Sequence, residues 1–129
     1  SLNYIRMPRR LKELGGSAFH ESALKKITVY GKVELNETFK YCKKLKTVVL
    51  KEGVKELGEY VFIHCPKLRS VTVPKSVKGL VCIYDNIFYY RGLKCNLSNI
   101  TIKTPKNSEM YRYRKFWKKR YKIKVKVIK

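Results

Sequence analysis

Acidic residues are scarce in this 129-residue sequence: nine Asp and Glu are present against 31 Lys and Arg, which gives a formal net charge of +22. So few carboxyl groups offer little material for general acid and base catalysis, and no Ser, His and Asp set, carboxylate pair or phosphate-cradling glycine loop stands out. We therefore expect a protein that is not an enzyme and uses no cofactor. The charge instead favours contact with a polyanion.

Cysteine and histidine are also scarce, with four Cys and two His. Four cysteines are too few for a disulfide-stapled mini-domain, and their spacing matches no metal motif. His20 and His64 lie beside a repeated Phe without a full set of four ligands, so we expect no metal site. Cys42 and Cys65 are expected to be free buried thiols that act as small hydrophobic side chains.

Long apolar runs and targeting segments are missing as well. No run approaches the roughly 18 apolar residues that a membrane span needs, so we expect no integral membrane segment. The segment from Ser1 to Ile5 lacks the charged and apolar regions of a signal peptide. The length fits one domain, which we place over residues 1–129.

What the sequence does contain is a repeat of an apolar residue, two others, an apolar residue, one other and a third apolar residue. The pattern begins at Leu2, Leu24, Leu45, Leu68 and Leu97. This spacing is typical of leucine-rich repeats. We expect repeats over about residues 2–23, 24–44, 45–67, 68–96 and 97–105.

The second half of each unit repeats too, with Val54, Leu57 and Phe62 aligned to Val33, Leu35 and Phe39. Residues 45–65 and 68–80 fit best to L-x-x-V-x-(I/L)-P-x-x-V-x-x-I-G-x-x-A-F-x-x-C, and in this the chain resembles the BspA-like class of bacterial leucine-rich repeat proteins over about residues 2–105. The resemblance implies an α/β solenoid, a right-handed superhelix of about four to five rungs with short strands on its concave face. It also implies a bacterial, mostly adhesive, cell-surface or secreted protein.

In such a rung, strand side chains alternate between the core and the outer face, so outward residues form columns. We predict that two columns bind a protein or glycan partner: Tyr4, Lys26, Thr47, Ser70 and Asn99, and beside them Arg6, Thr28, Val49, Thr72 and Thr101. Polar residues at these positions also simply keep a sheet soluble. The first rung has no evident cap, so we expect either preceding repeats or an end-to-end oligomer.

Residues 81–96 follow the repeat poorly and carry four aromatic side chains. These fill the core or form a projecting loop, and core filling is favoured. Arg91 and Gly92 are expected in a turn. The aromatic residues are Tyr84, Phe88, Tyr89 and Tyr90.

The C-terminal segment 106–129 is interpreted as a cap made of a helix and a strand. Ser108 can cap a helix over residues 106–122, and Lys122 to Val127 alternates like a strand with one buried face. One helical face is aromatic and is expected to cover the last rung. Its members are Met110, Tyr113, Trp117 and Tyr121.

The same segment provides an alternative function, because residues 103–129 carry 12 basic residues and one acidic residue. They predict an electrostatic binder of nucleic acid or another polyanion. No groove-reading or base-stacking motif accompanies them, so only non-specific contact is expected. A membrane-surface role ranks third, and a structural spacer without a ligand is a further alternative. The predicted polyanion contacts are Arg112, Arg114, Lys115, Lys118, Lys119, Arg120 and Lys122.

Overall fold

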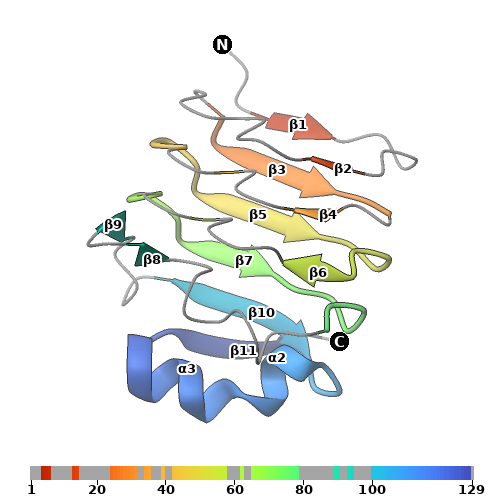
Figure 1. Ribbon diagram of the computed structural model, residues 1–129, viewed down its shortest axis with the longest axis vertical. Helices are drawn as coiled ribbons and strands as arrows, with labels where there is room; N and C mark the ends of the chain where they lie inside the picture. Colours follow the sequence, from red (N-terminus) through yellow and green to blue (C-terminus); the bar gives the residue numbers. More distant parts are fainter. Residues whose placement is uncertain are drawn as a thin grey trace.

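A computed structural model describes residues 4–6, 13–14, 24–31, 34–35, 39, 42–57, 62, 65–78, 89–90, 93–94 and 100–128. Its main feature is a six-stranded sheet in which all neighbouring strands are parallel (Figure 1). In spatial order the strands are β1 (Tyr4–Arg6), β3 (Lys26–Val29), β5 (Thr47–Leu50), β7 (Ser70–Thr72), β10 (Thr101–Pro105) and β11 (Lys124–Ile128).

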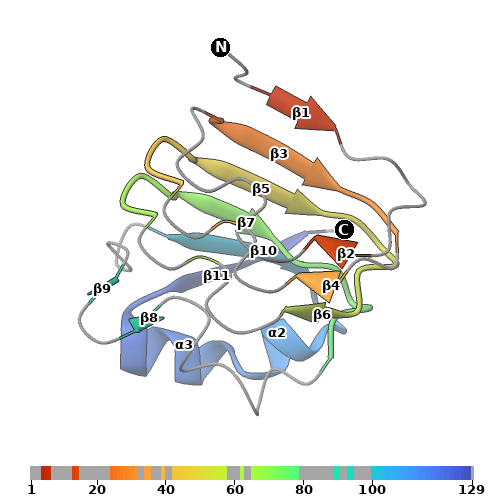
Figure 2. The same cartoon turned by 45° about the horizontal axis from the view of Figure 1, so that its top comes forward.

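A second, three-stranded parallel sheet is formed by the first three rungs and faces the large sheet (Figure 2). It contains β2 (Glu13–Leu14), β4 (Glu34–Leu35) and β6 (Glu56–Leu57). Each of these short strands follows a strand of the large sheet along the chain, so one sequence repeat contributes one strand to each sheet. The predicted stacked, solenoid-like repeat is therefore confirmed, while its right-handed superhelical form and number of rungs stay predictions.

The core lies between the two sheets and follows the repeat residue by residue. The Leu that opens each central unit is almost fully buried, as Leu24, Leu45 and Leu68 are no more than 2% exposed. The Phe residues stack in the same way, since the rings of Phe39 and Phe62 are nearly parallel with centroids 5.7 Å apart. Each such side chain contributes about 1.5–3 kcal/mol through burial, which only stacking of rungs can provide.

The turns of neighbouring rungs also stack. Cys42 and Cys65 are fully buried thiols that form no disulfide, as predicted, and the Cys65 thiol donates a hydrogen bond of 2.9 Å to the Phe39 carbonyl oxygen. Gly53 has a φ of +106°, and a Cβ there would lie 3.2 Å from the Cα of Gly31, the next turn in the stack. This close approach of two backbones requires a residue without a side chain.

The register of β10 differs from the prediction. Aligning Leu97 with Leu68 places Ile100 beside Val71, whereas Ile102 is the residue that pairs with Val71. A shift of two residues leaves every side chain on its original face, so the apolar alternation fits both registers equally well. Thr104, buried in place of an apolar residue, fixes the observed register through a 2.7 Å hydrogen bond to the Val73 carbonyl oxygen.

The predicted helix is divided into α2 (Glu109–Arg112) and α3 (Arg114–Tyr121), because the backbone at Tyr113 leaves the helical region. Ser108 is the N-cap of α2, as predicted, and its hydroxyl accepts a 3.0 Å hydrogen bond from the Tyr111 amide. The Ser108 and Thr104 hydroxyl oxygens are 2.6 Å apart. Because Thr104 donates its only proton to Val73, Ser108 must donate to Thr104, so a directed chain of hydrogen bonds joins the helix to the residue that follows β7.

The aromatic face of the two helices covers the last rungs, as predicted. Met110 and Trp117 are buried, and Tyr113 and Tyr121 are partly buried against the same core. The predicted C-terminal strand is also present as β11, with Ile123 buried directly before it. This strand pairs with β10 and thereby becomes the sixth strand of the large sheet.

Residues 89–94 contain a short antiparallel pair, β8 (Tyr89–Tyr90) and β9 (Leu93–Lys94), in which Tyr90 is opposite Leu93. The turn predicted at Arg91 and Gly92 lies outside the described residues. Whether the aromatic residues of 81–96 fill the core or form a projecting loop depends on side chains outside the described residues. The predictions for His20, His64 and Asn99 also lie outside them. None of the helices in the described part of the chain is long and apolar enough to cross a membrane.

Candidate functional site

The residues of the predicted partner-binding columns lie on the strands of the large sheet, apart from Asn99, which is outside the described residues. Tyr4, Lys26, Thr47 and Ser70 are register partners on successive strands, and so are the Arg6, Thr28, Val49 and Thr72 positions. Neighbouring strands are about 4.8 Å apart, so each column places its residues at a regular spacing along the array.

The last predicted member of the second column is wrong. Thr101 pairs with Ser70, so it belongs to the first column, and Lys103 takes its place beside Thr72. The columns then continue onto β11, where Lys124 pairs with Thr101 and Lys126 with Lys103. The reason is the two-residue register shift of β10, together with the entry of the C-terminal strand into the sheet.

The outer face differs along its length in charge and exposure. Lys26, Lys124 and Lys126 are exposed, whereas the central residues are half-buried. Thr28 is buried with 6% of its surface exposed, so its hydroxyl contributes little to the accessible face. Basic residues thus lie toward the two ends of the face, with hydroxyl groups and one valine between them. The half-buried central residues are Thr47, Val49, Ser70 and Thr72.

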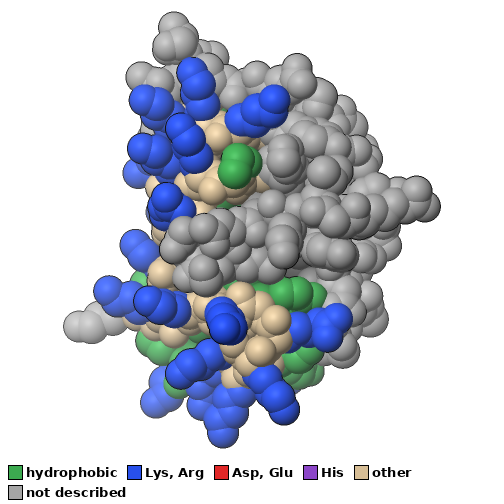
Figure 3. Space-filling view, turned by 90° about the vertical axis from the view of Figure 1, so that its left-hand side faces the viewer, with side chains coloured by type: hydrophobic (Ala, Val, Ile, Leu, Met, Phe, Trp, Pro, Cys, Tyr) green, Lys and Arg blue, Asp and Glu red, His purple; other side chains and the backbone are tan. Residues whose placement is uncertain are grey.

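A second feature is a basic cleft between α3 and β11. It has a volume of about 580 Å³ and is lined only by lysines. A smaller hollow of about 400 Å³ adjoins the cleft, and the walls of this hollow also include Arg114, Ile123 and Val125. Figure 3 shows Lys and Arg side chains over this end of the molecule, with no acidic side chain among the coloured residues in view. The lysines that line the cleft are Lys115, Lys118, Lys119, Lys122 and Lys124.

The repeat can now be compared with known families. The family model described as "BspA type Leucine rich repeat region" matches the chain in six copies, over residues 1–94 and 36–116. This chain belongs to the BspA-type leucine-rich repeat family. No curated protein and no solved structure matches the chain significantly. Repeat arrays of this kind present extended binding surfaces, so membership indicates a protein-interaction module.

In this BspA-type domain, the predicted polyanion contacts are only partly brought together. Lys115, Lys118, Lys119 and Lys122 share the cleft, and Arg114 lines the adjoining hollow. Arg112 is exposed but lines neither the cleft nor the adjoining hollow.

Two of the predicted arginines make contacts within the cap. The Arg114 guanidinium lies 4.1 Å from the Tyr111 ring centroid and donates a 3.1 Å hydrogen bond to the Tyr111 carbonyl oxygen. Arg120 lies over the Tyr121 ring, with its guanidinium carbon 5.6 Å from the centroid. Such cation–π contacts hold the arginines against the helix surface. The lysines, not the arginines, therefore dominate the cleft.

Sequence reasoning missed three lysines that the fold brings to these surfaces: Lys103 and Lys126 on the outer face, and Lys124 at both the outer face and the cleft. The period-two alternation of residues 122–127 was the available signal. It predicted a strand with alternating lysines but not the sheet that the strand joins.

Proposed function

We propose that this domain is a non-catalytic interaction module that binds a protein partner through the outer face of its six-stranded sheet. The observation that carries the proposal is the pair of register-aligned columns, which extends across all six strands. A stacked sheet holds its outward side chains on a rigid support, so little conformational entropy is lost when a partner binds.

The charge of the outer face indicates which kind of protein partner it can bind. The two columns contain basic residues toward both ends and no acidic residue, with Thr47, Ser70 and Thr72 as hydrogen-bonding groups between them. Complementary charge steers association and excludes partners of the wrong sign. The expected partner therefore presents acidic residues at the edges of its contact surface and neutral polar groups at its centre.

The test uses two variants with the same net charge. Lys103→Glu with Lys126→Glu reverses the charge at the C-terminal end of the outer face. Lys55→Glu with Lys75→Glu reverses two exposed lysines that follow β5 and β7 along the chain and belong to neither column. A partner recovered from the native source is titrated against both variants and the wild type by biolayer interferometry. Like charges brought together across an interface cost several kcal/mol, so we expect the first variant to lose about tenfold or more in affinity and the second to change little. Equal losses would rule out the outer face.

The lysine cleft supports a second candidate function, electrostatic binding of nucleic acid. The side chains of five lysines line one open cleft, and counterion release makes phosphate contacts by such residues steeply dependent on salt. If all five neutralise a phosphate, affinity for duplex DNA falls roughly 500-fold between 50 and 200 mM salt. Lys115→Glu with Lys119→Glu should flatten this dependence, whereas Lys106→Glu with Arg112→Glu, outside the cleft, should not. A shallow salt dependence of the wild type would remove this candidate.

A further inference from the structure

A row of basic residues lies where the central strands begin, separate from both surfaces described above. Lys25, Lys46 and Arg69 directly precede β3, β5 and β7, and all three are exposed. The Lys46 amide donates to the Lys25 carbonyl oxygen at 2.9 Å, and the Arg69 amide donates to the Lys46 carbonyl oxygen at 2.9 Å. One basic residue per rung is therefore fixed in register, at a spacing of about 4.8 Å.

The turns that lead into β5 and β7 add three more exposed basic residues. Lys43 and Lys44 lie between the buried residues Cys42 and Leu45, and Lys67 lies between the buried Cys65 and Leu68. Each turn is closed by a hydrogen bond from the Leu amide to the Cys carbonyl oxygen, 3.2 Å long in the first and 3.1 Å in the second. The buried ends hold the backbone of these short turns in place, so the exposed lysines extend from fixed backbone positions. The basic strip is defined as Lys25, Lys43, Lys44, Lys46, Lys67 and Arg69.

The charges of the basic strip are not compensated within the described part of the chain, where none of the six side chains makes an ion pair. Three acidic residues of the described chain, Glu13, Glu34 and Glu56, are instead register partners in the small sheet. Figure 3 views the molecule from the side where β3, β5 and β7 begin, and Lys and Arg side chains gather along it with no acidic side chain among the coloured residues. An anion bound there relieves the repulsion between like charges.

We infer that the basic strip binds a linear sulfated polysaccharide laid along the axis of the array. A row with at least one exposed basic residue in each of three successive rungs fits a polymer that carries regularly repeated anions. Five of the six residues are lysines, which act as hydrated point charges without the bidentate geometry of arginine, so binding responds to anion density more than to a specific pattern.

Two other polyanionic partners fit the strip less well. Single-stranded nucleic acid is bound through aromatic side chains on which bases stack, and none of the six described residues that define the strip is aromatic. A lipid surface is bound by inserted apolar side chains, but the large exposed hydrophobic residue of the described chain is Val127, in β11 at the far end of the sheet. The inference goes beyond the proposed function, because it concerns a different surface and a different class of ligand.

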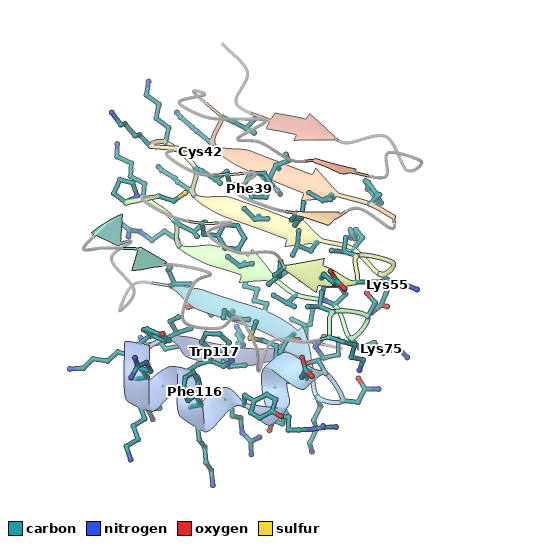
Figure 4. The ribbon with its side chains drawn as sticks, viewed as in Figure 1. Phe39, Cys42, Lys55, Lys75, Phe116 and Trp117 are labelled. Atoms are coloured by element: carbon teal, nitrogen blue, oxygen red, sulfur yellow. The ribbon has the colours of Figure 1, made fainter. Side chains whose placement is uncertain are left out.

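The test measures heparin binding by isothermal titration calorimetry at near-physiological salt. The strip variant is Lys25→Glu, Lys46→Glu and Arg69→Glu, and its matched control is Lys55→Glu, Lys75→Glu and Lys78→Glu, three exposed lysines with the same total charge change. Figure 4 shows two of the control residues, Lys55 and Lys75, at the opposite ends of the strands and directed away from the core. All six side chains are exposed, so both variants should unfold at temperatures close to that of the wild type.

We expect the strip variant to bind heparin at least tenfold more weakly, with a log–log salt slope reduced by about three, one for each lost contact. The control should stay within about twofold of the wild type, and chemically desulfated heparin should not bind. A glutamine version of the strip variant, which removes charge without reversing it, should show an intermediate loss.

Three outcomes would overturn the inference. Equal losses in the strip variant and the control would show that net charge alone attracts heparin. Weaker heparin binding by the Lys115→Glu, Lys119→Glu cleft variant, with unchanged binding by the strip variant, would place the heparin site in the cleft. Duplex DNA or phosphatidylserine vesicles that bind as tightly as heparin, with the same dependence on the strip, would replace the polysaccharide by nucleic acid or by a membrane surface.

Discussion

Replacing Thr104 by valine tests the hydrogen-bond chain that joins the C-terminal cap to the array. Valine keeps the shape of threonine but removes the hydroxyl that donates to the Val73 carbonyl oxygen at 2.7 Å and lies 2.6 Å from the Ser108 hydroxyl. Thr104 is fully buried and Ser108 is 3% exposed. Water therefore has no access to replace the lost hydrogen bonds.

The expected cost follows from the two groups that lose a partner, the Val73 carbonyl and the Ser108 hydroxyl. An unsatisfied buried polar group costs about 1–3 kcal/mol, and the serine hydroxyl retains some freedom to rotate, so the free energy of unfolding should fall by about 2–4 kcal/mol. A loss of 1 kcal/mol lowers the Tm of a chain of this size by about 4 °C, which gives an expected decrease of roughly 8–16 °C.

The matched control is Thr101→Val in the same strand, where the side chain is half-buried on the outer face. Substitutions at such positions usually change stability by no more than about 0.5 kcal/mol. Thermal unfolding followed by circular dichroism, together with urea unfolding, measures both variants. Equal stability of the Thr104→Val and Thr101→Val proteins would refute the assigned hydrogen-bond chain.

Two further predictions concern the stacked turns and the core. Gly53→Ala should lower the free energy of unfolding by about 1–3 kcal/mol in urea titrations, because alanine is strained at a positive φ and its Cβ approaches Gly31; an increase in stability would contradict this. In a chain whose Cys82 and Cys95 are replaced by serine, the buried Cys42 and Cys65 thiols should react with a thiol reagent only as the protein unfolds. Fast labelling of the native protein would show that this core is open.

The sequence predicted the central rungs well because each rung repeats the physical requirements of the one before it. Leu24, Leu45 and Leu68 are buried at equivalent positions, and Phe39 stacks on Phe62, because an inward side chain must fit the same residue type one strand away. The cap was predictable for a similar reason. Trp117 lies on an apolar helical face, which is stable only when it packs against other apolar residues. The last rung of the array exposes such residues until a cap packs on it.

The register of β10 and the binding surfaces were harder to predict, for different physical reasons. Alternation specifies which face a side chain occupies but not its position along the strand, so Thr101 was assigned to the wrong column. Exposure depends on neighbours from distant parts of the chain, so the burial of Thr28 was not foreseen. The basic strip was within reach of the sequence, because Lys25, Lys46 and Arg69 each directly follow the Leu that opens a repeat, and the backbone hydrogen bonds place these positions side by side.

The length of chain between register partners has a consequence for how such a protein can be altered. Lys26 pairs with Thr47 after 21 residues and Ser70 pairs with Thr101 after 31, yet both steps cross a single strand spacing. Evolution or an engineer can therefore lengthen the connection between Lys78 and Ile100 while the sheet keeps its pitch. One residue inserted within β5 would instead exchange core and surface along the rest of that strand. The connections, rather than the rungs, are the sites where a new peptide or domain can be spliced into this scaffold.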